Sequence, residues 1–148
     1  MLVTHDQIEA FALADIIGVI KDGRMCQWDT AYNLYHEPVD RFVANFIGEG
    51  AFVRGRLVAP DAIETELGLI KGNRAYSWAL DSIVDVLLRP DDVQPDTSGE
   101  LSAQVVGKAF KGAQILYSLR LATGSTVLSM FPSHDNHALG PTEIFRKR

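Results

Sequence analysis

The segment Gln114–Phe131, QILYSLRLATGSTVLSMF, carries the clearest fold signal in the chain. In its first half, Ile115, Tyr117 and Leu119 occupy every second position, which is the period of a β-strand with one buried face. Gly124-Ser125 then separates this run from a second apolar run. The pattern predicts a pair of neighbouring strands joined by a tight turn.

Outward from this pair, the second part of the chain continues as short apolar runs separated by Gly, Pro, Asp or Asn. Such spacing is typical of a small β-barrel or sandwich. The predicted strands are Ala51–Val58, Ala62–Leu67, Arg74–Leu80, Ile83–Arg89, Leu101–Ala109, Gln114–Ala122 and Thr126–Phe131. After Pro141 the sequence predicts that the closing strand of such a barrel is missing, which would leave an edge open to pairing.

The first part of the chain has a different pattern. His5–Ile16 repeats its apolar residues with a helical period, and Asp22-Gly23 between two apolar runs predicts a hairpin. Thr30 is suited to cap a short helix that Pro38 ends, and a further helix follows it. Phe42, Val43, Phe46 and Ile47 share one face of that helix.

These patterns predict an α+β chain with a boundary near Gly48-Glu49-Gly50. A short helical and hairpin segment, residues 1–48, precedes a mainly β, OB-like small barrel, residues 49–148.

Composition narrows the classes of function. The net charge is −5, with seven acids against three bases in residues 1–48 and twelve against eleven in residues 49–148, so we expect no nucleic-acid partner. No apolar run is long enough to cross a bilayer, and no signal peptide follows Met1. A single cysteine, Cys26, excludes an internal disulfide framework and fits a reducing compartment.

Three consecutive stretches of residues 1–48 resemble a known family. VTHDQIEAFALAD (3–15), KDGRMCQWDT (21–30) and LYHEPVDRFVANFIGE (34–49) are similar, in order and spacing, to the last part of an ABC-transporter ATPase domain. The resemblance implies that His5 is the switch histidine, which would stabilise charge near the γ-phosphate of ATP. It also implies that ATP and Mg²⁺ are the cofactors of a parent protein.

The parts that grip ATP are missing from this sequence. It has no phosphate loop G-x-x-x-x-G-K-[ST], no apolar strand ending in Asp-Glu and no signature motif. We therefore expect the chain by itself to hold no cofactor and to hydrolyse no ATP.

The second part of the chain resembles the accessory domain that follows importer ATPases, the TOBE domain. Leu87-Leu88-Arg89-Pro90-Asp91 resembles its strand-ending signature. Three further stretches, 110–112, 116–121 and 132–134, are most similar to the ferric-iron branch of these importers. Polyamine and sugar importers share the general plan. The resemblance implies a regulatory or dimerising β-domain that acts with an ATPase core and transmembrane permease subunits. It also implies a cytoplasmic place on the inner face of the cell membrane.

Two further hypotheses remain open from the residues. A free-standing barrel could bind a small anion or a regulatory protein; the first candidate ligands for an anion are Arg54, Arg56, Arg89 and Lys111. His134 and His137 are weak metal candidates, and no third ligand is evident beside them.

Apolar helix faces left without an ATPase core predict self-association, as a homodimer.

Overall fold

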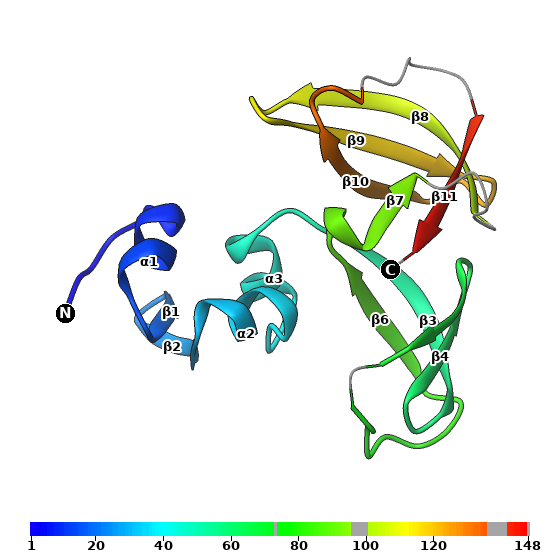
Figure 1. Cartoon of the computed structure of the whole chain (residues 1–148). Helices are drawn as coiled ribbons and strands as arrows, with labels where there is room; N and C mark the ends of the chain where they lie inside the picture. The colour runs from blue at the N-terminus through cyan, green and yellow to red at the C-terminus, as the bar shows by residue number, and fades with distance from the viewer. Residues whose placement is uncertain (73, 96–100, 136–141, 148) are drawn as a thin grey trace. The chain divides into compact units, whose positions relative to one another are not determined.

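The computed structural model describes residues 1–72, 74–95, 101–135 and 142–147, the last of these ranges for its backbone. The chain forms two compact units, Met1–Glu49 and Gly50–Arg148 (Figure 1). The described part is mostly β with short helices. None of the helices in the described residues is long and apolar enough to cross a membrane.

Unit 1 is a hairpin with three short helices. Its elements are α1 (Gln7–Leu13), β1 (Ile17–Lys21), β2 (Arg24–Asp29), α2 (Ala31–His36) and α3 (Arg41–Ile47). The predicted hairpin turn is confirmed, because Asp22 and Gly23 have φ of 50° and 74°, the left-handed values that this turn requires.

Side-chain caps fix where the helices of unit 1 begin. Asp6 accepts hydrogen bonds from the backbone N–H groups of Ile8 and Glu9, and Thr30 accepts one from Asn33, as predicted for α2. Asp40 caps α3 in the same way. Behind these caps lies a small apolar core, made of Val19, Leu34, Val43 and Ile47.

Unit 2 contains two antiparallel sheets (Figure 1). One has the strand order β5-β4-β3-β6 and the other β10-β9-β8-β11-β7. The elements are β3 (Ala51–Ala59), β4 (Ala62–Thr65), β5 (Gly68–Lys71), β6 (Ile83–Leu88), η1 (Pro90–Asp92), β7 (Val93–Pro95), β8 (Leu101–Phe110), β9 (Gln114–Leu121), β10 (Thr126–Pro132) and β11 (Thr142–Lys147).

The buried core of unit 2 draws on both sheets. The hairpin predicted from 114–131 is confirmed as β9 and β10, and the alternating Tyr117 and Leu119 are fully buried. The Tyr117 ring packs 5.1 Å from that of Phe131. Val53 of β3 and Leu88 of β6 join the same cluster, so the two sheets share one core.

The five-stranded sheet curls until its two edges meet. β10 and β7 are the edge strands in the pairing order, yet the buried Ser129 hydroxyl of β10 donates a hydrogen bond to the Val93 carbonyl of β7. A side chain thus joins two strands that no backbone ladder joins. Among the described strands the ladders do not close, and an OB-like barrel is not confirmed.

Two predictions about strands were wrong: the strand over residues 74–80, and the absence of a closing strand after Pro141. Residues 74–80 form no strand; the backbone N–H of Tyr76 instead donates to the Pro60 carbonyl, which folds this segment back as a loop. The strand next to β4 is β5, whose four residues are too short a run to stand out in the sequence. The last strand is also present: β11 pairs with both β7 and β8.

We expect Ser129→Ala to lower the free energy of unfolding by about 1–3 kcal/mol, because it leaves the buried Val93 carbonyl without this donor. Chemical denaturation followed by far-UV circular dichroism would measure the change. Ser118→Ala, on the less buried side of β9, is the matched control and should change stability much less. Equal losses in the two variants would show that the bond between the sheet edges contributes nothing special.

Candidate functional site

His5 lies in the exposed segment before α1. Its neighbour Asp6 makes the helix cap, so His5 has no part in starting the helix. Nothing in unit 1 supplies a phosphate-binding loop around it, and its proposed role in a parent ATPase stays a prediction.

The four cations predicted as anion ligands lie in three different settings. Arg54 and Arg56 project from the exposed face of β3. Arg89 is 2% exposed at the turn into η1, where its backbone N–H donates to Asp92 Oδ2 at 2.7 Å. Lys111 lies in the exposed β8–β9 turn. Of the four, only Arg54 and Arg56 lie on the same face of one strand. Anion binding by these four residues stays a prediction.

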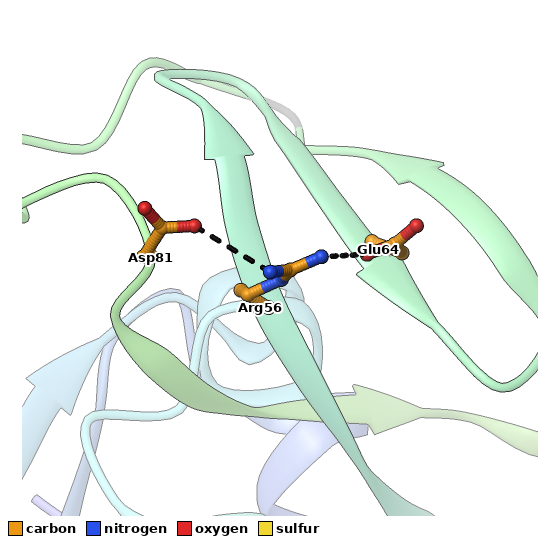
Figure 2. Close-up of polar contacts among 3 residues, drawn as sticks. All are labelled: Arg56, Glu64 and Asp81. Atoms are coloured by element: carbon orange, nitrogen blue, oxygen red, sulfur yellow. Dashed lines mark hydrogen bonds and ion pairs between the residues drawn. The ribbon is translucent and has the colours of Figure 1, made fainter.

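Arg56 is the centre of an ion-pair cluster on unit 2 (Figure 2). Its guanidinium lies between two carboxylates, with Nη2 2.6 Å from Glu64 Oε2 and Nη1 3.8 Å from Asp81 Oδ1. The hydrogen bond to Glu64, followed by the charges of Glu64 and Asp81, raises the pKa of Arg56. Both carboxylates already compensate the positive charge of Arg56, which weakens its attraction for a free anion.

Strand register sets this cluster in a row across the four-stranded sheet. Leu69 of β5 pairs with Glu64 of β4, Glu64 with Arg56 of β3, and Arg56 with Ile83 of β6. The outer members are apolar and exposed, Leu69 at 55% and Ile83 at 63%. We call these four residues the β-row. The β-row is thus a central Arg–Glu ion pair with one exposed apolar side chain on either side of it.

The sequence predicted only one member of the β-row as a functional residue. Arg56 was singled out as a cation, but Glu64 and Asp81 come from another strand and from a turn. One sequence signal could have pointed to Glu64. It lies in a short run in which apolar and polar residues alternate, next to the run of β3, which alternates in the same way.

A second exposed surface lies on the β1–β2 hairpin. One face of this hairpin contributes Val19 to the core of unit 1. On the other face Trp28 lies directly over Gly18: a Cβ built on Gly18 would fall 2.6 Å from the indole ring and 3.0 Å from Met25. Trp28 is 65% exposed, and Ile20 and Met25 beside it are exposed too. We call Ile20, Met25 and Trp28 the hairpin face.

The metal candidates find no support in the described residues. His134 is exposed in the turn after β10, and His137 lies outside the described residues. Within the described ranges, no group of three His, Cys, Asp or Glu side chains could hold a metal ion.

Comparison with known proteins matches residues 86–143 to the TOBE domain family. Two relatives are the spermidine/putrescine import ATP-binding proteins PotA of Mesomycoplasma hyopneumoniae strain J and strain 232. Each is 32% identical over 152 residues, which covers 99% of this chain and 32% of the relative. The chain thus spans about a third of the length of these curated relatives.

The family model covers the strand-ending signature at Arg89-Pro90-Asp91 and most of the five-stranded sheet, and the relatives extend the similarity to almost the whole chain. The chain therefore carries a TOBE domain and is homologous to the C-terminal part of ABC-importer ATP-binding proteins.

Proposed function

We propose that this chain acts as the C-terminal docking and self-association region of an importer's ATP-binding subunit. The observation that carries the proposal is that each unit exposes large apolar side chains on one face, in the hairpin face on unit 1 and at both ends of the β-row on unit 2. In the complete subunit an ATPase core would bind ATP and Mg²⁺ and contact transmembrane permease subunits. The place of action is then the cytoplasmic face of the cell membrane.

The solute that such an importer carries is best proposed from the relatives. Both are named for spermidine and putrescine import, so we propose a polyamine. The similarity of 110–112, 116–121 and 132–134 to the ferric-iron branch gains no support from these relatives.

Unit 1 supplies the surface for the ATPase core. The hairpin face is apolar, and the indole of Trp28 occupies the space that a side chain at Gly18 would need. Large apolar side chains gathered on one exposed face mark an interaction site. The occupant we propose is the nucleotide-binding part of the same subunit, because the relatives carry about two thirds of their length beyond the matched region.

Trp28 fluorescence tests this docking. The chain has two tryptophans, so Trp78→Phe leaves Trp28 as the only indole. Its emission should shift to shorter wavelength when the nucleotide-binding part of a spermidine/putrescine import ATP-binding protein is added, because docking removes the exposed ring from water. The matched variant Trp28→Phe, which reports from Trp78, should show no shift. Unchanged Trp28 emission, or a shift only from Trp78, would argue against the hairpin face.

The β-row supplies a self-complementary surface for a second copy of the chain. Its order is Leu69, Glu64, Arg56, Ile83. Two sheets packed face to face about a two-fold axis parallel to the strands would place Arg56 opposite the partner's Glu64, and the apolar ends opposite each other. A two-fold interface requires this kind of self-complementarity. We therefore propose a homodimer through the β-row.

Charge reversal tests the homodimer. Arg56→Glu alone and Glu64→Arg alone should each weaken self-association about tenfold or more, because like charges would face each other across the axis. A mixture of the two variants should associate again, since an all-acid row then meets an all-base row. Sedimentation velocity measures each case, and Arg120→Glu, on an exposed position of β9, is the control.

The mixture separates the interface from the internal ion pair. If Arg56 and Glu64 mattered only to each other within one chain, mixing would restore nothing. Failure of the mixture to associate, or dimers that neither Arg56→Glu nor Glu64→Arg weakens, would refute the β-row interface.

The isolated chain should hydrolyse no ATP. His5 is present, but no loop cradles phosphate in this sequence, and phosphoryl transfer depends on positioned phosphate and Mg²⁺ ligands. Phosphate release measured with and without Mg²⁺ checks this, with His5→Ala as the control. A Mg²⁺-dependent turnover that His5→Ala removes would contradict the expectation.

A further inference from the structure

Unit 2 also contains a pocket of about 210 Å³ between the inner side of the four-stranded sheet and the η1 turn. Its apolar lining comes from three strands and includes Ile63, Ile70 and Val86. Ligand sites in proteins are mostly apolar cavities with a few placed polar groups, and this volume is small for that class. The size therefore restricts an occupant to a small molecule.

One wall of the pocket is an aromatic ring held from several sides. The Tyr76 ring lies against the backbone of Gly72, where an added Cβ would fall 2.8 Å from Tyr76 Cε2. Trp78 stacks on the same ring at 4.8 Å, and the guanidinium carbon of Arg74 lies 5.5 Å from its centre. The backbone N–H of Tyr76 is bonded to the Pro60 carbonyl. The wall is therefore formed before any ligand arrives, which lowers the entropy cost of binding.

Two opposite charges line the pocket. Lys71 is exposed at the end of β5, and Asp92 belongs to η1. The hydrogen bond from the Arg89 backbone N–H to Oδ2 fixes the carboxylate of Asp92, and a carboxylate can accept several hydrogen bonds at once. A cation and a carboxylate beside an apolar lining match a ligand that carries both charges and an aliphatic body.

We propose that this pocket binds a small zwitterion with an aliphatic side chain, of the class of the branched aliphatic amino acids. The ligand's carboxylate would face Lys71, its ammonium would face Asp92, and its side chain would contact Ile63, Ile70 and Val86. A diamine fits less well, because Lys71 would repel one of its two ammonium groups. The site goes beyond the proposed function and does not depend on the hairpin face or on the β-row.

Methyl NMR on the whole chain tests the pocket. L-leucine should cause saturable shifts of the Ile63, Ile70 and Val86 methyl signals. Two analogues, 3-methylbutylamine and 4-methylpentanoate, each lack one of the charges and should bind about tenfold more weakly, which corresponds to about 1.4 kcal/mol. Putrescine, which has two ammonium groups, should bind more weakly than L-leucine.

Two matched variants assign the charge. Lys71→Met keeps the length of an exposed side chain and should weaken L-leucine binding about tenfold, while leaving 3-methylbutylamine binding unchanged. Lys108→Met, an exposed lysine of β8 that does not line the pocket, should change neither. Val86→Phe should fill the cavity and abolish the shifts of the Ile63 and Ile70 methyl signals.

Three results would overturn the proposal: no saturable shift with L-leucine at millimolar concentration, equal effects of the two lysine substitutions, or tighter binding of putrescine than of L-leucine. The titration is repeated in the Arg56→Glu variant, so that a failure of the homodimer and a failure of the pocket are distinguished.

Discussion

The hydrogen bond from Ser129 to the Val93 carbonyl is the contact on which the β unit most depends. It joins β10 and β7, the two edge strands of a five-stranded sheet that no backbone ladder closes. On the inner side of this curl, Tyr117 and Leu119 of β9 are fully buried in the apolar core. The four-stranded sheet packs its Val53 and Leu88 onto that core, which leaves its outer side to solvent and to partners.

Local signals predicted the local structure. The Asp22-Gly23 turn, the Thr30 cap and the alternation at Tyr117 and Leu119 each act within a few residues, and the structure has all of them. The wrong predictions concerned segments whose secondary structure depends on contacts with residues far away in the sequence. Tyr76 is drawn into a loop by the Pro60 carbonyl, and β11 is a strand because β7 and β8 flank it on both sides.

The same division holds for the surfaces. Arg56 stood out as a cation, but its meaning depends on Glu64 and Asp81, which only the strand register and the turn bring to it. The exposed hairpin face depends on Gly18, because the indole of Trp28 lies where a side chain at this position would be. The glycine alone did not predict that contact from the sequence. The family itself came from the resemblance of whole stretches, which no single residue carries, and the TOBE match and the relatives agree with it.

The position of β11 has a consequence for synthesis on the ribosome. It lies between β7 and β8 in the sheet, yet it follows every other strand of that sheet in the chain. Until it is translated, β7 and β8 each lack a neighbour, and unpaired strand edges invite wrong pairing. The ladder of this sheet therefore cannot be completed in the order in which its strands are synthesised. A polypeptide that ends before Thr142 would keep β10, β9 and β8 paired but would leave β7 without its ladder partner, and such a chain is a substrate for chaperones and proteases.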